Sequence, residues 1–393
     1  MSSQLAATLA PHRVARSLPR AAFVDPVSLA LDAETLFRDR WIAVGHADDL
    51  DKPGAWVRAA SPERGDLAVV RTAELELTLL SRICRHRGVP LLAGDGGHLP
   101  RLELVCPYHG WTYDLGGALR RAPGLPACAR QEDLSLHAGF VATRGPLVFA
   151  RPDTSADPSN PPPPPTLPPW LERADLAMLR RAHESAHVVA ANWKLCVGNF
   201  QESHHFPHVH PALEARTPFR SSSSVLPTQS DESATWLGGI MELSEGLETV
   251  SGSGQRDGRL FVAAPQDRRL VHDAWIAPNL LTSLQPDYLL SYRLEPEAVD
   301  RTRVVFSIDV HRGAADHAVA EGIEDLVRFW STTNAEDRSI CEAQQRGLAA
   351  APRGYPAGPR ATSEDGLAAF EAIVARGYLA LGSGLALGGG TRA

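Results

Sequence analysis

The sequence of 393 residues predicts an α+β fold, in which a small N-terminal β domain precedes a larger domain with an antiparallel sheet and flanking helices. Three observations predict it. Short β-rich runs divided by Gly and Pro turns fill the first part of the chain, and a proline-rich stretch follows them. Further strand-like runs then lead into one long amphipathic helix.

Composition divides the chain into four parts. We expect an N-terminal arm over residues 1–34, a β domain over 35–155, a linker over 156–170 and the larger domain over 171–385. In the β domain, strands are predicted at runs such as 67–71, 75–80 and 102–106. The linker is rich in proline, which lacks a backbone donor, so a stiff polyproline II spacer is favoured over a ligand for an SH3 domain.

The larger domain is predicted to begin with two helices, over 171–181 and 191–200. Strand-like runs follow at 235–243, 259–263, 280–284, 288–294 and 303–310. A long helix from about residue 323 to residue 346 closes the pattern, and Gly347 is predicted to end it.

The bulk properties are those of a globular protein. Hydrophobic residues make up 44% and charged residues 22%, and the formal net charge of −7 offers no basic surface, so we expect no nucleic-acid partner and no membrane partner. No secretory signal is apparent, although Arg13, Arg16 and Arg20 would also suit a transit peptide. Five cysteines at irregular spacing argue against a disulfide framework and favour a cytoplasmic protein.

Two short hairpins each carry one cysteine and one histidine. They are Cys84-Arg-His86 and Cys106-Pro-Tyr-His109. A structural zinc is one interpretation, but zinc ribbons usually pair like ligands in one loop. A Rieske [2Fe-2S] cluster needs two Cys on one iron and two His on the other, which suits loops that each supply one of each. The other cysteines (Cys128, Cys196 and Cys341) are predicted to be small buried apolar residues.

A second constellation contains four histidines within seven residues, at positions 204, 205, 208 and 210. Imidazole and carboxylate ligands suit Fe(II) with positions left open for O₂. His204 and His208 would share one face of a helix, but Pro207 disturbs any helix there. Spacing alone therefore leaves the choice of ligands open.

The long helix offers a carboxylate for the same site. Its apolar stripe contains Ile323, Leu326, Trp330, Cys341 and Leu348. Asp337 falls inside this stripe, whereas Glu336 and Glu342 are predicted to point well away. An acid on an apolar face is costly unless it is paired or metal-bound, so Asp337 is either a metal ligand or a partner in a buried salt bridge.

At these residues the sequence resembles the Rieske-type ring-hydroxylating oxygenases. Residues 84–88 (Cys-Arg-His-Arg-Gly) and 106–114 (Cys-Pro-Tyr-His-Gly-Trp-Thr-Tyr-Asp) look like the family's cluster motif, and the choline, carnitine and betaine monooxygenases are the most similar in motif. The resemblance implies that Cys84, His86, Cys106 and His109 bind the cluster. The gap of 19 residues between His86 and Cys106 is longer than expected.

The resemblance also indicates which histidines and which acid would bind the second metal. The family's acid-x₂-His-x₄-His motif falls on Glu202, His205 and His210, and residues 336–348 resemble its closing helix, whose Asp is an iron ligand. It therefore implies His205, His210 and Asp337 as ligands of Fe²⁺, with His204 and His208 packing around them. Glu202 is implied to hydrogen-bond His205 and, across a subunit interface, His109 of a neighbour.

The function implied is oxygenation of a small organic substrate by O₂, with Glu202, His205, His210 and Asp337 as the catalytic residues. The sequence shows no complete G-x-G-x-x-G motif, so electrons from NAD(P)H are expected to arrive through a separate reductase, with or without a ferredoxin. The resemblance further implies a homotrimer. Glu202 with Asn199 three residues before it resembles relatives that act on quaternary ammonium compounds or other small amines, which implies monooxygenation of an amine, by hydroxylation or oxidative N-demethylation.

Three alternatives are kept. The first is cis-dihydroxylation or N-oxygenation of an aromatic by the same metals. The second is an electron-transfer or sensor protein that uses the cluster alone, and the third is a zinc-stabilised binding module. Phe206, Met241 and Trp275 are candidates for a substrate pocket, but such residues are more often part of a core.

Overall fold

The computed structural model describes residues 2–10, 15–62, 65–153, 160–227, 235–314 and 316–387. Its contacts divide the chain into two compact units. The first comprises Phe37–Pro165, and the second combines Met1–Leu36 with Thr166–Ala393. The residues predicted as an N-terminal arm therefore group with the unit that follows the β domain. Residues 156–159 of the predicted linker, and Arg13, lie outside the described residues.

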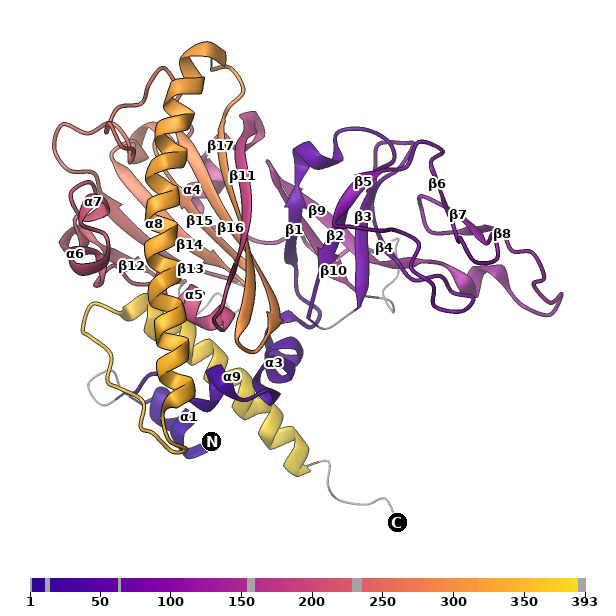
Figure 1. Ribbon diagram of the computed structural model, residues 1–393, viewed down its shortest axis with the longest axis horizontal. Helices are drawn as coiled ribbons and strands as arrows, with labels where there is room; N and C mark the ends of the chain where they lie inside the picture. Colours follow the sequence, from indigo (N-terminus) through magenta and orange to yellow (C-terminus); the bar gives the residue numbers. More distant parts are fainter. Residues whose placement is uncertain are drawn as a thin grey trace. The chain divides into compact units, whose positions relative to one another are not determined.

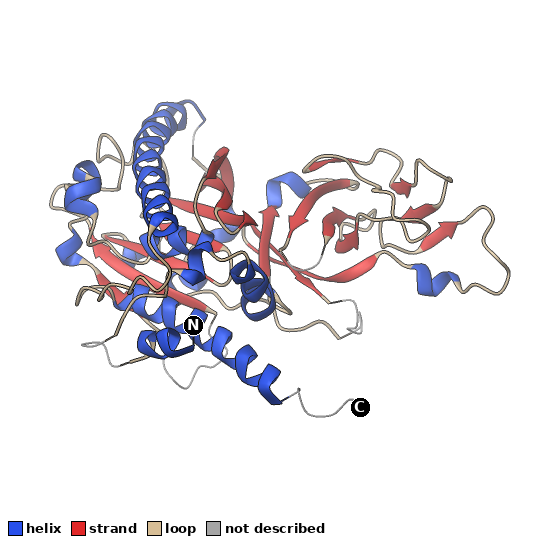
Figure 2. Cartoon of the chain, turned by 60° about the horizontal axis from the view of Figure 1, so that its bottom comes forward, coloured by secondary structure: helices blue, strands red, loops and turns tan. Residues whose placement is uncertain are grey.

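The unit of residues 37–165 is built almost entirely from strands and loops (Figure 2). One antiparallel sheet has the order β1-β10-β9-β4-β3-β2-β5. Its strands are β1 (Ile42–His46), β2 (Ala55–Ala60), β3 (Asp66–Arg71), β4 (Leu77–Ser81), β5 (Gly96–His98), β9 (His137–Arg144) and β10 (Leu147–Pro152). A smaller sheet consists of β6 (Glu103–Val105), β7 (Thr112–Asp114) and β8 (Leu119–Arg121). Two 3₁₀ turns complete the unit, η2 (Ala47–Leu50) and η3 (Gln131–Leu134).

The second unit is organised around an antiparallel sheet with the order β11-β17-β16-β15-β14-β13-β12. Its strands are β11 (Leu179–Val189), β12 (Ser223–Val225), β13 (Trp236–Glu242), β14 (Leu270–Ile276), β15 (Leu280–Leu284), β16 (Tyr288–Ala298) and β17 (Arg301–His311). Side chains alternate between the two faces of each strand, so every second residue of β14 to β17 faces the same layer of helices. Gly238 of β13 admits the indole of Trp170, because a Cβ there would lie 2.3 Å from the ring.

Helices cover this sheet, and the longest, α8, crosses one of its faces (Figure 1). The helices are α1 (Ser2–Thr8), α2 (Ala21–Val24), α3 (Val27–Asp32), α4 (Pro169–Arg173), α5 (Trp193–Phe200), α6 (Phe206–Val209), α7 (Pro211–Glu214), α8 (Asp316–Ala350) and α9 (Asp365–Leu387). Short turns are η1 (Ala33–Phe37), η4 (Leu176–Met178), η5 (Phe219–Ser221) and η6 (Pro265–Asp267). No helix in the described ranges is long and apolar enough to cross a membrane.

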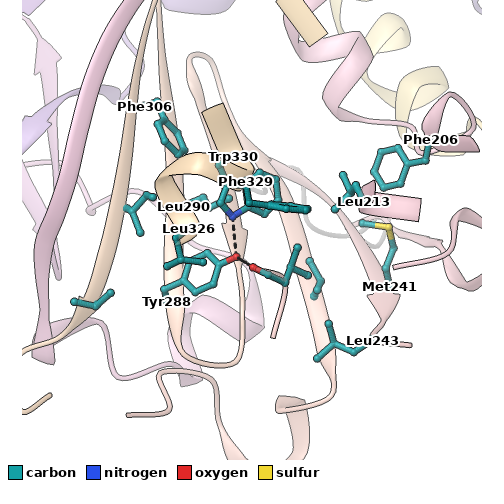
Figure 3. Packing of buried hydrophobic residues seen from close by; sticks show 14 of the residues in the cluster. Phe206, Leu213, Met241, Leu243, Tyr288, Leu290, Phe306, Leu326, Phe329 and Trp330 are labelled. Carbon is teal, nitrogen blue, oxygen red and sulfur yellow. Dashed lines mark hydrogen bonds between the residues drawn. The ribbon is translucent and has the colours of Figure 1, made fainter. Parts of the chain in front are cut away.

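The apolar stripe of α8 packs on the sheet and fixes the helix in place. Leu326, Phe329 and Trp330 point toward the strands, where they join a buried cluster with Tyr288 and Phe306 (Figure 3). Trp330 Nε1 donates to the hydroxyl of Tyr288 at 2.8 Å, and that hydroxyl donates in turn to a backbone carbonyl. The face of α8 that carries Asp337 is thereby held against the sheet.

A buried ion pair ties the N-terminal helices to α5. The side chains of Asp32 and Lys194 are both 0% exposed and form a salt bridge. Trp193 Nε1 also donates to Asp32, at 2.9 Å, and Tyr378 of α9 donates to the same carboxylate. Burial lowers the pKa of Lys194, and Asp32 opposes that shift. The start of α5 is therefore anchored by a residue that lies more than 150 positions earlier in the chain.

The predicted elements fail in a few places. The helix predicted over 171–181 ends at Arg173, and β11 takes over from Leu179, because this segment pairs with β17 along its whole length. The run 259–263 is a loop and not a strand, since Arg259 is buried there against Asp287. Gly347 does not end α8, which continues to Ala350. Neither β14 nor α9 is among the elements that the sequence pattern predicted.

Candidate metal centres

The two Cys/His loops of the first unit have the same construction. One lies between β4 and β5 and the other between β6 and β7. In each loop a glycine closes a turn back to the cysteine, with Gly88 N to Cys84 O and Gly110 N to Cys106 O both at 3.0 Å. The glycines have φ of +76° and +68°, a left-handed conformation that favours this residue. Two matching turns therefore present the four candidate ligands.

The cysteines and histidines of these loops lie at different depths. Cys84 is 2% exposed and Cys106 3%, whereas His86 and His109 are exposed. The two imidazole rings meet with centroids 4.7 Å apart, and His86 also stacks on Trp111 at 4.6 Å. Two buried thiols beneath two exposed imidazoles fit a [2Fe-2S] cluster whose inner iron is held by Cys and whose outer iron is held by His.

Tyr113 is placed to hydrogen-bond the sulfur of Cys84, one of the four candidate cluster ligands. Its buried hydroxyl lies 3.6 Å from Cys84 Sγ and accepts a hydrogen bond from Arg85 N at 3.2 Å. Burial and the neighbouring Cys84 raise the pKa of Tyr113 well above its usual range, so the hydroxyl stays protonated. Its proton is free to point at the sulfur.

Replacing Tyr113 with phenylalanine is expected to lower the reduction potential of the cluster. A hydrogen bond to sulfur stabilises the more negative reduced state, and about 1 kcal/mol for such a bond corresponds to roughly 40 mV. Voltammetry of the purified chain measures the shift. Tyr355→Phe removes an exposed phenol hydroxyl in the other unit of the chain and is the control; an equal shift in both variants would contradict a specific role for the Tyr113 hydroxyl.

The second candidate metal centre lies where the chain is interrupted between the short helices α5, α6 and α7. α5 ends at Phe200, His205 stands just before α6, and His210 separates α6 from α7 with a non-helical conformation (φ −124°, ψ 65°). Residues five apart on a continuous helix would point about 140° away from one another. The break brings the two imidazole rings together, with centroids 5.1 Å apart.

The third member of the group comes from α8. Asp337 Oδ1 lies 2.8 Å from His210 Nε2 and 3.6 Å from His205 Nε2. One ligand atom from each of these three residues can be chosen so that all lie within 4.8 Å of one another. Two neutral nitrogens and one carboxylate converging from three directions form the facial arrangement that suits Fe(II).

The outer nitrogens of both imidazoles are held by carboxylates. His205 Nδ1 hydrogen-bonds Glu202 Oε1 at 2.6 Å, and His210 Nδ1 hydrogen-bonds Glu336 Oε2 at 2.7 Å. Such partners fix the ring and leave Nε2 free for a metal. The expectation that Glu336 points well away from the site is therefore wrong, because its longer side chain reaches back to His210 from the neighbouring position on α8. Each metal-binding histidine needs a hydrogen-bond acceptor for its other ring nitrogen. This requirement could have identified Glu336 from the sequence.

The electrostatics of this group favour a bound cation. Burial alone would lower the pKa of His205, but Asp337 and Glu202 outweigh it and raise that pKa to about 9. Burial would likewise raise the pKa of Asp337, yet the two histidines hold it below its usual range. A divalent metal supplies the positive charge that a proton otherwise provides here, so the donor set fits iron in both chemistry and charge.

The remaining sequence candidates lie outside the group. His204 is exposed and packs edge-on against Phe219, and His208 is exposed on a shallow surface hollow. Glu342 accepts a hydrogen bond from Ala190 N at 3.1 Å. The prediction that the three other cysteines are buried is right for Cys341 and wrong for Cys128, which is exposed, while Cys196 is only half-buried.

A cavity of about 110 Å³ opens beside the three converging residues, between the sheet and helices α5, α6 and α8. Most of its wall is apolar, and Phe206 and Met241 belong to it, as do Cys196 and Cys341. Trp275 lies elsewhere, against Phe370 of α9. A metal at this position would face a partly enclosed, mostly apolar space large enough for a small organic molecule.

Comparison with known protein families agrees with both centres. The family described as "Rieske [2Fe-2S] domain" matches residues 40–136, and "Ring hydroxylating alpha subunit (catalytic domain)" matches residues 176–380, more than half of the chain. The chain belongs to the ring-hydroxylating oxygenase alpha subunits. As an alpha subunit it is an oxygenase with a [2Fe-2S] cluster and a mononuclear iron, and a separate reductase supplies its electrons.

Individual relatives span most of this alpha subunit. The glycine betaine monooxygenase oxygenase subunit of Pseudomonas aeruginosa is 25% identical, over 84% of this chain and 82% of its own. The carnitine monooxygenase oxygenase subunit of Acinetobacter pittii is 24% identical, over 92% and 95%. A crystal structure of a quaternary ammonium Rieske monooxygenase shares the fold, with a TM-score of 0.74, 21% identity and coverage of 96% and 98%. These findings confirm the family resemblance and the α+β fold, and they favour neither the zinc module nor the cluster-only carrier.

Proposed function

We propose that this alpha subunit monooxygenates a small ammonium compound, by hydroxylation or oxidative N-dealkylation. The observation that carries the proposal is the convergence of His205, His210 and Asp337 at the wall of a partly enclosed, mostly apolar cavity. The relatives named for glycine betaine and carnitine support an ammonium substrate.

The ligand assignments are part of the proposal. Cys84 and Cys106 would hold one iron of the cluster and His86 and His109 the other, which agrees with their depths in the loops. His205, His210 and Asp337 would hold the mononuclear iron through Nε2, Nε2 and a carboxylate oxygen. When bound, the mononuclear iron activates O₂ and the cluster supplies it with single electrons.

The chain's own residues prepare this chemistry. Glu202 and Glu336 hold the outer nitrogens of the two imidazoles, so that each Nε2 points inward. Asn199 Nδ2 lies within hydrogen-bond distance of His205 Nε2, at 3.3 Å, so its amide stands beside the nitrogen that would hold the iron. The apolar wall excludes bulk water, which protects a reactive centre from side reactions.

The partners extend beyond one chain. We propose a reductase that draws on NAD(P)H, with or without a ferredoxin, and a homotrimer in which Glu202 of one subunit approaches His109 of a neighbour. The exposure of His109 supports an approach from outside its own loop. We also propose a cytoplasmic location, because free cluster cysteines persist best in a reducing compartment.

Replacing Glu202 with glutamine is expected to reduce substrate-coupled turnover by about 100-fold or more, because a neutral amide oxygen holds His205 Nδ1, and an imidazole of the neighbouring cluster, less strongly than a carboxylate does. Cluster absorbance should stay unchanged, and a tenfold loss of iron affinity is the most we expect. Metal analysis and oxygen-uptake assays measure these effects. Glu214→Gln, a nearby acid that hydrogen-bonds only Phe219 N among the described residues, is the control.

The proposed function is tested with the purified chain, an electron-donating reductase, and matched panels of ammonium compounds and arenes. We expect oxygen uptake that depends on an ammonium compound, with formaldehyde or a hydroxylated product identified by mass. Turnover of arenes alone, with incorporation of both oxygen atoms into a cis-diol, would replace this proposal by dihydroxylation.

A further inference from the structure

The cavity beside the iron site contains an acidic side chain that the site does not use. Asp273 of β14 lines this cavity together with Glu202 and Asp337. Asp337 belongs to the metal group, and both oxygens of Glu202 hydrogen-bond His205, through Nδ1 at 2.6 Å and the backbone N at 3.2 Å. Asp273 makes no contribution to either set of contacts.

The surroundings of Asp273 leave its charge uncompensated. Ser283 faces it across the β14–β15 pair and hydrogen-bonds its carboxyl group, while the same hydroxyl accepts from Gln285 Nε2 at 2.8 Å. Arg338 also lines the cavity, but the hydrogen bond from Ser283 is what opposes the effect of burial, and burial raises the pKa of Asp273 to about 7. A buried carboxylate without a cationic partner is costly.

Aromatic rings surround the same space. Phe200, Phe206, Tyr292 and Trp330 all line the cavity, and the rings of Phe200 and Tyr292 lie 6.0 Å apart. The faces of such rings attract organic cations, and most strongly where water is excluded. The sequence alone did not allow an aromatic cage to be placed, whereas the fold assembles these four rings from α5, α6, β16 and α8.

Tyr292 links Asp273 to the iron site. The phenol donates to Asn334 Oδ1 at 3.0 Å, three residues before Asp337 on α8. Burial raises the pKa of Tyr292, and the next largest causes are the negative charges of Asp337 and then Asp273. Asp273, Tyr292 and Asp337 all line the same cavity. A cation beside Asp273 would therefore share that cavity with the site where oxygen is activated.

We propose that Asp273 is the residue that selects a positively charged substrate, by pairing with an alkylammonium head group held among the four aromatic rings. This inference rests on the proposed function and adds the group that recognises the charge. The uncompensated carboxylate favours a cation over a neutral molecule of the same shape. The partner of this charge is a substrate, because the space that Asp273 faces is the cavity itself.

The test compares ligands that differ only in charge. Choline is paired with 3,3-dimethylbutan-1-ol, and glycine betaine with 3,3-dimethylbutanoate, so that carbon replaces the ammonium nitrogen. Equilibrium dialysis against the iron-loaded protein under anaerobic conditions gives the Kd of each ligand without turnover. The two pairs also distinguish a simple cation from a zwitterion as the ligand that binds.

We expect the wild-type protein to prefer the ammonium member of at least one pair. Asp273→Asn, which keeps the shape and the contact with Ser283, should weaken binding of that member about 10- to 100-fold and leave its carbon analogue within about twofold. Asp273→Glu should restore part of the preference. Asp309→Asn changes a buried acid on the opposite face of the same sheet and is the matched control, with an unchanged preference expected.

Two other outcomes are informative in different ways. If Asp273→Asn retains the wild-type preference for the ammonium member, or weakens both members equally, Asp273 has a structural role and the inference is overturned while the proposed function stands. If the wild-type protein prefers the carbon analogues or binds neither pair, and turns over no ammonium compound, the proposed function fails and this inference fails with it.

Discussion

Replacing Asp337 with alanine is expected to remove the mononuclear iron and to lower kcat/KM by about 1000-fold or more, equivalent to about 4 kcal/mol of transition-state stabilisation. The carboxylate is the sole acidic member of the group with His205 and His210. Without it, two neutral imidazoles remain to hold a divalent ion, and neither the geometry nor the charge of the site is complete. The cluster lies in the other unit, so its absorbance should be unchanged.

Three measurements separate this effect from unfolding. Metal analysis should give about two thirds of the wild-type iron per chain, because the two irons of the cluster remain, and oxygen uptake with substrate should fall to background, while circular dichroism stays unchanged. Glu324→Ala, an exposed acid on α8, is the control and should behave as wild type. Retention of iron and turnover in Asp337→Ala would remove Asp337 from the ligand set, and Glu336→Ala would then be the variant to test.

Replacing Lys194 with methionine is expected to destabilise the protein by about 3–5 kcal/mol, because it leaves the fully buried Asp32 with no opposite charge. Asp32 would keep the hydrogen bond from Trp193 Nε1 at 2.9 Å, but a neutral donor does not offset the desolvation of a carboxylate. Urea unfolding followed by tryptophan fluorescence measures the change.

The double variant Lys194→Met with Asp32→Asn makes the interpretation specific. Both charges are then absent while the hydrogen bond from Trp193 is retained, so most of the lost stability should return. Arg301→Met removes the ion pair with Glu297 at the surface and is the control, with an expected change of about 0.5 kcal/mol or less. Equal losses in Lys194→Met and the double variant would show that the packing of the lysine stem matters more than its charge.

The sequence predicted the metal centres better than it predicted their surroundings. Chemistry limits which side chains can bind iron, so a few Cys, His and Asp residues stand out, and the fold brings His205, His210 and Asp337 within reach of one another. Residues that act through these ligands are ordinary acids and aromatics, and their positions depend on tertiary packing. Glu336 and Asp273 could not be recognised without knowing which side chains they face.

The same distinction applies to the fold. Strands such as β16 and β17 were predicted near their bounds, because both are buried over most of their length and show as runs of apolar, β-branched and aromatic residues in the sequence. The segment at Leu179 was predicted as helix, since its local composition allows one, but pairing with β17 decides its conformation. The strand prediction for residues 259–263 is wrong for a related reason. The apolar residues beside Arg259 pack around its buried ion pair with Asp287 and do not form the backbone hydrogen bonds of a strand.

The pairing of Asp32 with Lys194 also sets the order in which the protein can be completed. The residues up to Leu36 leave the ribosome first, yet their partners on α5 and α9 are made only after the whole of Phe37–Pro165. The β unit, Phe37–Pro165, is thus inserted in the sequence of the second unit. It can fold before the residues up to Leu36 have met their partners on α5 and α9. An exchange of β units between related enzymes would accordingly need two junctions, one on either side of the insertion, and would leave the early helices with their original partner.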